Sequence, residues 1–207
     1  MFQSAFRRLF FFEALSIYKY EAEITSVKFF DAASAVEYNA AGMGFEKISV
    51  IGVGTVVFFA EGVGRLHSFH GASGKISILS SPDPEALRLA ARRFDALHSV
   101  NFLADPAFIR EAAERGVPFE IPFRLFLERT GVERARLFHR ARFFLRVCIK
   151  HGADFFFTSR AESVLEARSP SEIASVAEAA LGLSRDQALR ALSAVPKKLI
   201  EEARVEK

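Results

Sequence analysis

Positively charged side chains are concentrated in one stretch of the sequence, residues 118–150. This stretch has eight arginines and lysines against three glutamates, a net charge of +5, whereas the whole chain of 207 residues has a net charge of only +3. Arginine has a planar guanidinium group that can bind phosphate through two parallel hydrogen bonds and can stack on nucleobases. The stretch therefore indicates a surface that binds a polyanion.

The C-terminal half of this stretch has the periodicity of an amphipathic helix. With a turn of about 100° per residue, one arc of roughly 140° is apolar. It holds Leu137, Phe138, Ala141, Phe144, Leu145, Cys148 and Ile149. The opposite side holds Arg136, Arg140, Arg142, Arg146 and Lys150, with His139 and Phe143 among them. An ordinary solvated helix face would explain such a pattern, but the nearly pure positive charge favours contact with nucleic acid or with an acidic protein.

Two other patterns could bind a ligand. His67 and His70 have the spacing of a metal-binding pair, but they lie in a Gly/Ser-rich loop, and Glu61 is the one flanking carboxylate. The Gly-x-Gly pairs at residues 52–54 and 62–64 resemble fragments of phosphate-binding loops. Neither pair completes a G-x-G-x-x-G motif, and neither is followed by the Lys-Ser/Thr of a nucleotide-binding loop. We therefore expect an exposed loop rather than a metal or nucleotide site.

Catalytic carboxylates would have to come from the predicted strands. Glu120 and Asp154 lie in such strands, and barrel enzymes place catalytic carboxylates at the C-terminal ends of their strands. Asp154, however, begins its strand, which argues against a catalytic role. The spacing of Ser, His and Asp residues indicates no triad. The residues alone therefore predict a basic domain that binds a polyanion.

Short apolar runs alternate with helical segments and form the framework of the predicted fold. Six predicted strands lie at residues 27–30, 47–53, 75–79, 96–102, 117–121 and 153–158, and residues 55–74 are ambiguous. Predicted helices cover residues 85–94, 106–115, 170–181, 185–195 and 197–204. Asp-Pro pairs and Ser-x-x-Glu/Gln boxes mark several helix starts. Strands that alternate with helices predict a parallel α/β fold, either a βα barrel or an open doubly wound sheet, with six or at most seven strands.

Composition sets limits on the class of protein. Half of the residues are apolar and 23 are phenylalanine, which excludes intrinsic disorder. One cysteine, Cys148, excludes an internal disulfide framework and fits a reducing cytoplasm. No run of 18 apolar residues occurs, so we expect a soluble protein that does not span a membrane. We expect one domain at residues 27–207 and an N-terminal extension at residues 1–26.

Five short segments occur in the order and spacing of a known family. They are Arg115-Gly-Val-Pro-Phe-Glu-Ile121, Phe123-Arg-Leu-Phe-Leu127, Glu133-Arg134, Phe157-Thr-Ser159 with Ala161, and Arg168-Ser-Pro170. The tail agrees through Gly182-Leu183, Gln187-Ala188, Ala191-Leu-Ser193 and Pro196. Together they resemble the archaeal ribonuclease P protein component 3 family. The resemblance covers residues 114–200 well, and residues 27–94 by pattern alone.

This resemblance implies a TIM-barrel-like fold with extra C-terminal helices. It implies a non-catalytic protein subunit of ribonuclease P, the endoribonuclease that removes 5′ leaders from precursor tRNA. It further implies that the RNA subunit holds the catalytic Mg²⁺, that this chain binds no cofactor, and that it pairs with ribonuclease P protein component 2. The related metal-dependent phosphoesterase barrels have a His-x-His pair, which this sequence lacks. The alternative is a metal-dependent hydrolase on the same barrel, or a small-molecule barrel enzyme. A third possibility is a purely structural protein whose basic face binds an acidic protein.

The predicted RNA-binding residues come from two sources. Arg124, Arg134 and Arg168 occupy positions that match the family, whereas Arg136, Arg140 and Arg142 are assigned from the charge pattern. Arg160 replaces a residue that is usually small in the family, so we expect a more basic loop there and include Arg160 among the predicted RNA-binding residues. The barrel is expected to lack one strand–helix unit between the strand at residues 96–102 and Phe119. Residues 1–26 have no counterpart in the family.

Overall fold

The computed structural model describes residues 30–33, 47–50, 55–66, 69, 76–162 and 166–205, with side chains from residue 55 to residue 202 within these ranges. The predicted extension at residues 1–26, the His67/His70 pair and the Gly-x-Gly pair at residues 52–54 lie outside the described residues. The division into an extension and one domain therefore stays a prediction.

All the strands in the described residues are parallel. β1 (Phe30–Ala33) pairs with β2 (Lys47–Val50). The second sheet has five strands in sequence order: β3 (Thr55–Phe59), β4 (Ile76–Ser81), β5 (Ala96–Ser99), β6 (Phe119–Pro122) and β7 (Phe155–Thr158). β1 also lies against β7. The described part of the chain thus has seven of the eight strands of a full TIM barrel, and the prediction of a TIM-barrel-like parallel fold is confirmed.

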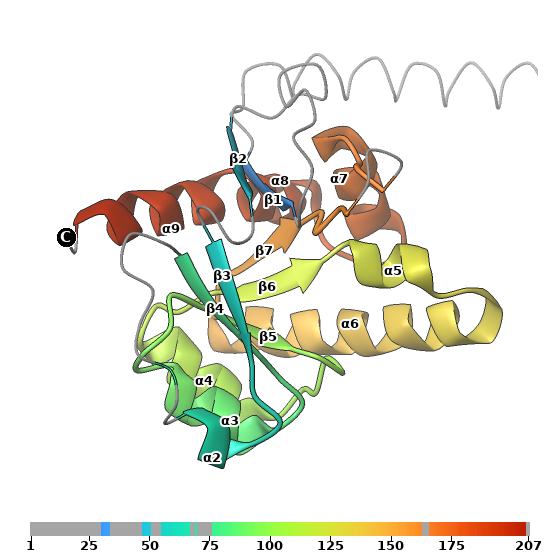
Figure 1. Ribbon diagram of the computed structural model, residues 1–207. Coiled ribbons are helices and arrows are strands. Elements are labelled where there is room, and N and C mark those ends of the chain that lie inside the picture. The colour runs from blue at the N-terminus through green and yellow to red at the C-terminus, as the bar shows by residue number, and fades with distance from the viewer. Residues whose placement is uncertain are drawn as a thin grey trace, which may run out of the picture.

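Helices lie between the strands and after the last one (Figure 1). Their bounds are α2 (Val63–Leu66), α3 (Pro84–Ala90), α4 (Pro106–Glu114), α5 (Arg124–Glu128), α6 (Gly131–His151), α7 (Pro170–Ala179), α8 (Arg185–Leu192) and α9 (Ala194–Val205). In Figure 1, α3, α4 and α6 run below the five-stranded sheet and α9 runs above it. β5, α4 and β6 form one complete crossover, and β5 pairs directly with β6, so the sheet has no gap at this point.

The helix starts follow the local signals in the sequence. Asp83 and Asp105 each accept a hydrogen bond from the backbone two residues ahead, and a proline follows each of them. Ser169 and Ser184 form complete capping boxes with Glu172 and Gln187. These short-range hydrogen bonds explain why the starts of four helices can be predicted from sequence alone.

The outer face of the sheet, toward α3, α4 and α6, is packed with aromatic side chains. Phe119 of β6 contacts Phe144 of α6 edge to face at 5.2 Å between ring centroids, and Phe108 of α4 at 5.8 Å. Phe108, Phe119 and Phe144 are all buried. Edge-to-face pairs stabilise a core beyond the burial of their area. This aromatic cluster fixes α4 and α6 to the sheet.

The inner face of the sheet is covered in part by the helix α9. Ile76 and Ile78 of β4, with Phe156 of β7, pack against Val195 and Leu199 of α9. In a TIM barrel, side chains from the other strands fill this space. Here a helix that follows all the strands in the sequence covers part of the inner face.

The structure differs from the predicted elements at several places. Of the strand predicted at residues 27–30, the structure describes only Phe30, which belongs to β1 (Phe30–Ala33), and Asp154, predicted in a strand, lies just before β7. Residues 55–74, ambiguous in the sequence, include β3 and α2. The strand predicted at residues 96–102 ends at Ser99, and Phe102 has a φ of 50°. α9 begins at Ala194, before the proline at which the sequence predicted a break, because proline is tolerated in the first turn of a helix.

Candidate functional site

The long helix α6 has the two faces that the sequence predicted. Ala141, Phe144, Leu145 and Cys148 are buried against the domain, and Gly152 ends the helix in the left-handed conformation. Ile149 was predicted on the buried face, and this is wrong because its side chain is 40% exposed. Ile149 lies at the opposite edge of the apolar arc from Phe144, and the sheet covers the Phe144 side.

The opposite face of α6 is exposed and basic. Its cations are Arg136, Arg140, Arg142, Arg146 and Lys150, and we call this surface the basic face. Among the residues that the structure describes, none of these five side chains forms an ion pair. The charge of the basic face is therefore not neutralised by carboxylates of the described part of the chain, and it is available to an anionic ligand.

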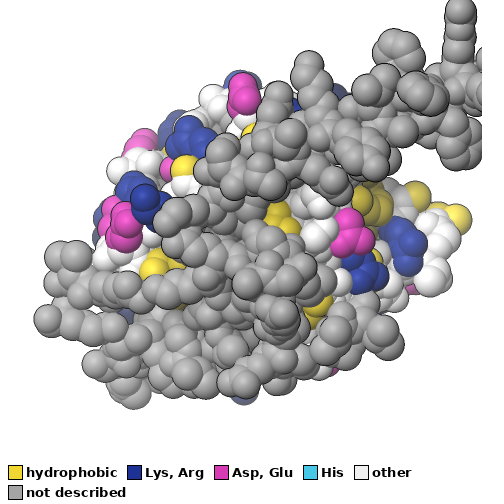
Figure 2. Space-filling view, turned by 90° about the horizontal axis from the view of Figure 1, so that it is seen from above, with side chains coloured by type: hydrophobic (Ala, Val, Ile, Leu, Met, Phe, Trp, Pro, Cys, Tyr) yellow, Lys and Arg dark blue, Asp and Glu magenta, His cyan; other side chains and the backbone are white. Residues whose placement is uncertain are grey.

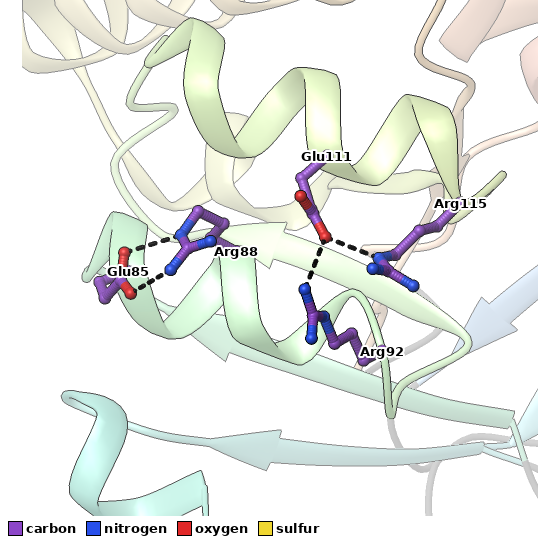
Figure 3. Close-up of polar contacts among 5 residues, drawn as sticks. All are labelled: Glu85, Arg88, Arg92, Glu111 and Arg115. Carbon is purple, nitrogen blue, oxygen red and sulfur yellow. Dashed lines mark hydrogen bonds and ion pairs between the residues drawn. The ribbon is translucent and has the colours of Figure 1, made fainter.

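Many basic residues on other surfaces are paired with carboxylates. Figure 3 shows Glu85 with Arg88 on α3, and Glu111 of α4 between Arg92 and Arg115. On α9, Lys197 and Lys198 each pair with the glutamate four residues later. In the view from above in Figure 2, basic and acidic side chains lie next to one another among the described residues. Among the described residues, α6 therefore differs from α3 and α9 in carrying five exposed cations on one face without an ion pair.

Arg134 and Arg124 have contacts within the chain. The guanidinium of Arg134 donates to the backbone oxygens of Arg129, at 2.5 Å, and Leu127, at 3.4 Å. These carbonyls lie at the C-terminal end of α5, where a cation is favourable. Arg124 forms ion pairs with Glu128 at 2.7 Å, with Glu166 at 3.4 Å, and with Glu162.

Arg160 lies at the C-terminal ends of β6 and β7 and is partnered by a buried carboxylate. It donates hydrogen bonds to both carboxylate oxygens of Glu120, from Nε at 2.8 Å and from Nη2. Thr158 donates to the same carboxylate at 2.6 Å. Burial alone would raise the pKa of Glu120, but the charge and hydrogen bonds of Arg160, with His98 and Thr158, lower it. Glu120 is therefore an ionised, fully partnered carboxylate.

His98 of β5 belongs to the same buried group. Its Nδ1 lies 3.3 Å from the backbone oxygen of Glu120. Burial, and after it the positive charge of Arg160, lower the pKa of His98 to about 4, although the charge and the backbone oxygen of Glu120 act in the opposite direction. A neutral imidazole that donates from Nδ1 to this oxygen fits the geometry. The other candidate carboxylate, Asp154, accepts a hydrogen bond from Arg190 of α8 at 2.6 Å.

The seven predicted arginines thus fall into two groups. Arg136, Arg140 and Arg142 lie together on the basic face, and Arg134 is on the same helix. The other three, Arg124, Arg160 and Arg168, flank the loop after β7, where the backbone nitrogen of Arg124 donates to the oxygen of Ser159. Arg168 donates to the oxygen of its neighbour Ala167 at 2.7 Å. RNA contact by all seven stays a prediction.

Of the other possible ligand-binding patterns, the Gly-x-Gly pair at residues 62–64 is the one that lies within the described residues. This pair lies at the start of α2, a helix of four residues. Within the described ranges, no group of three or more His, Cys, Asp or Glu side chains is close enough to hold a metal ion. In the same ranges, no helix is both long and apolar enough to cross a membrane.

Comparisons with known proteins agree on one family. The family model for RNase P subunit p30 matches residues 93–207. Ribonuclease P protein component 3 of Methanosarcina mazei is 33% identical over 135 residues, 65% of this chain and 54% of that protein. The protein of the same name from Methanothermobacter thermautotrophicus is 26% identical over 148 residues, 72% of this chain and 55% of that protein. The chain therefore spans about half the length of the curated relatives that it matches.

A solved structure has the same fold. A chain in the cryo-EM structure of an archaeal ribonuclease P with mature tRNA superposes on this chain with a TM-score of 0.62 and 16% sequence identity. The match covers 86% of this chain and 83% of that chain. At this identity the likeness shows a common fold.

Proposed function

The chain belongs to the RNase P subunit p30 family, and on that premise we propose that it is a protein subunit of ribonuclease P whose basic face binds the RNA of that enzyme. The proposed activity of the complex is removal of 5′ leaders from precursor tRNA in the cytoplasm. The RNA subunit supplies the catalytic Mg²⁺ in this proposal, and ribonuclease P protein component 2 is the proposed protein partner.

The observation that carries the proposal is the unneutralised charge on α6. Five cations lie on the exposed side of one helix of 21 residues, and no ion pair to a described residue offsets them. A rigid helix that presents arginines at fixed spacing can follow the phosphates of a folded RNA without reading its sequence. This matches a subunit that supports the structure of a catalytic RNA.

The arginines near β7 have a different proposed role. Arg160 and Arg124 are engaged by carboxylates, so an RNA phosphate would have to compete with Glu120 and with Glu162. We therefore place the first RNA contacts on Arg136, Arg140 and Arg142, with Arg146 and Lys150 added because they share the basic face. Arg134 and Arg168 contact RNA while they keep their backbone hydrogen bonds, since each guanidinium has five N–H donors.

Reconstitution tests the proposal most directly. The RNA subunit, ribonuclease P protein component 2 and precursor tRNA are mixed with and without this chain, and cleavage of the leader is measured at limiting Mg²⁺. We expect this chain to raise the rate, and a variant with Arg136, Arg140 and Arg146 changed to alanine to raise it less. An equal rate with and without the chain would contradict the proposal.

A further inference from the structure

A groove runs beside the basic face, between α6 and the loop that joins β5 to α4. Asn101, Leu103 and Asp105 line it from the loop, and His139, Arg140 and Phe143 line it from α6. Its volume is about 730 Å³, within the range of about 300–1,000 Å³ that is usual for small-ligand sites. The groove is therefore large enough for one nucleotide.

Phe143 lies on the α6 wall of this groove, and its side chain is 56% exposed. Arg140 and Arg146 are three residues before and after it, so they are its neighbours on the helix surface. On the loop side, Leu103 is 42% exposed. An exposed aromatic ring between two cations is suited to a ligand that has both a flat apolar face and negative charge.

The loop wall of the groove is held in place by the core. Phe102 is buried and stacks on Phe126 at 5.9 Å with an angle of 3° between the rings. The Ser99 hydroxyl accepts from the nitrogen of Leu103 at 2.9 Å, and the backbone nitrogen of Phe102 donates to the oxygen of Ser99 at 3.0 Å. These contacts hold Phe102 in the left-handed conformation, with φ of 50°. Asn101 and Leu103, on either side of it, are thereby fixed at the groove.

We propose that this groove binds one unpaired nucleobase of an RNA, with the base stacked on Phe143 and its phosphate held by Arg140. The inference rests on the proposed RNA-binding function and adds to it a site for a single base. Asn101 and Asp105, which line the groove, supply an amide and a carboxylate for hydrogen bonds. Asp105 Oδ1 accepts from the backbone nitrogen of Ala107 at 2.7 Å, and its second oxygen can accept from an N–H donor on the edge of a base.

The chemistry of the groove favours a base over an acidic peptide. Arg140 would attract the carboxylates of a peptide, but Asp105 on the opposite wall would repel them. A nucleotide has no such conflict, because its negative charge is on the phosphate and its base edge has N–H donors. RNA duplexes bury their bases in stacks, so the groove should prefer single-stranded RNA or an extruded base.

Tryptophan fluorescence can report on this site directly, because the chain has no tryptophan. The Phe143→Trp variant of the full chain places one indole in the groove. Titration with single-stranded decamers of adenosine or uridine should quench its emission as a base stacks on the ring. Phe59→Trp is the matched control, because Phe59 is also an exposed phenylalanine, 46% exposed, but lies on β3. Its emission should not change.

Affinity measurements separate this inference from the function on which it rests. Stacking on an aromatic side chain strengthens binding of a base, so Phe143→Ala should weaken binding of the single-stranded decamers about five- to a hundredfold. The same variant should weaken binding of a ten-base-pair RNA duplex by less than about twofold. If Phe143→Ala leaves all RNA binding unchanged while Arg136→Ala with Arg146→Ala weakens it, the base site is wrong and the basic face stands. If neither variant changes RNA binding, both proposals are wrong. Stronger quenching by poly-glutamate than by the decamers would overturn the base site in favour of an acidic protein.

Discussion

Arg160 donates hydrogen bonds to both carboxylate oxygens of Glu120, a residue forty positions earlier in the sequence. Glu120 lies in β6, and Arg160 follows the C-terminal end of the neighbouring strand β7. The Glu120 side chain has no exposed surface, and that of Arg160 is 18% exposed. Two opposite charges at this depth stabilise the fold only as a pair, because either charge alone would be buried without a partner.

Removal of one partner should therefore destabilise the domain. We expect Arg160→Ala to lower the free energy of unfolding by about 3–5 kcal/mol. The double variant Glu120→Gln with Arg160→Met should lose less, since it leaves no buried charge. Urea unfolding at pH 7 measures both. A loss below about 1 kcal/mol in Arg160→Ala would mean that the ion pair contributes little.

The stability of the domain should also depend on pH through His98. The folded pKa of about 4 lies below the ordinary value of 6.5, so the unfolded chain binds more protons between these pH values. Stability from the neutral imidazole is fully present above pH 6.5, and as the pH falls toward 4 about 3 kcal/mol of it is lost. Urea unfolding at pH 7 and pH 5 measures the part of this loss that falls between these pH values, about 2 kcal/mol. His98→Asn keeps a donor near the Nδ1 position and removes the titration, so its midpoint should fall less over the same interval.

The basic face should be detectable in the salt dependence of RNA binding. Each phosphate contact to a single strand contributes about 0.7 to the slope of log affinity against log salt concentration. We expect Arg136→Ala with Arg146→Ala to reduce the slope by about 1.4. The matched control is Arg88→Ala with Arg92→Ala, which removes the same charge from arginines that already pair with carboxylates (Figure 3). Equal effects of the two double variants would mean that net charge, and not the basic face, sets the affinity.

Two glycines with the same conformation allow a test of Arg142. Gly152 and Gly182 both have a φ of 71°, so alanine at either position should lower stability by about 1–2 kcal/mol. A Cβ at Gly182 would lie 2.9 Å from Nε of Arg142, whereas a Cβ at Gly152 would meet no atom within 4 Å. Gly182→Ala should therefore displace the Arg142 guanidinium and weaken RNA binding, and Gly152→Ala should not. Equal RNA affinities would exclude Arg142 from the contact.

The sequence predicted those parts of the fold that depend on near neighbours. Asp83, Asp105, Ser169 and Ser184 cap helices through hydrogen bonds to residues two or three positions ahead, so the signal is local. The region of β3 stayed ambiguous because glycines surround it, and its place in the sheet depends on pairing with β4 more than 15 residues away.

The candidate site was predicted in part for the same reason. The exposed arginines of α6 follow from helical periodicity alone. The partner of Arg160 could not be predicted, because Glu120 comes from another strand and the contact depends on the register of β6 and β7. The loop at Asn101 likewise reaches α6 through tertiary packing, and its turn depends on the strained backbone of Phe102.

The position of α9 has a consequence for synthesis of the chain. Val195 and Leu199 cover Ile76, Ile78 and Phe156, yet all of these strand residues are translated before α9. A ribosome adds about 5–20 residues per second, so the part of the inner face that α9 covers waits for seconds after β4 is made before α9 can pack on it. During that interval the nascent sheet exposes an apolar surface that a chaperone can bind. The time needed to translate the residues between these strands and α9 thus sets how long this apolar patch is open to aggregation.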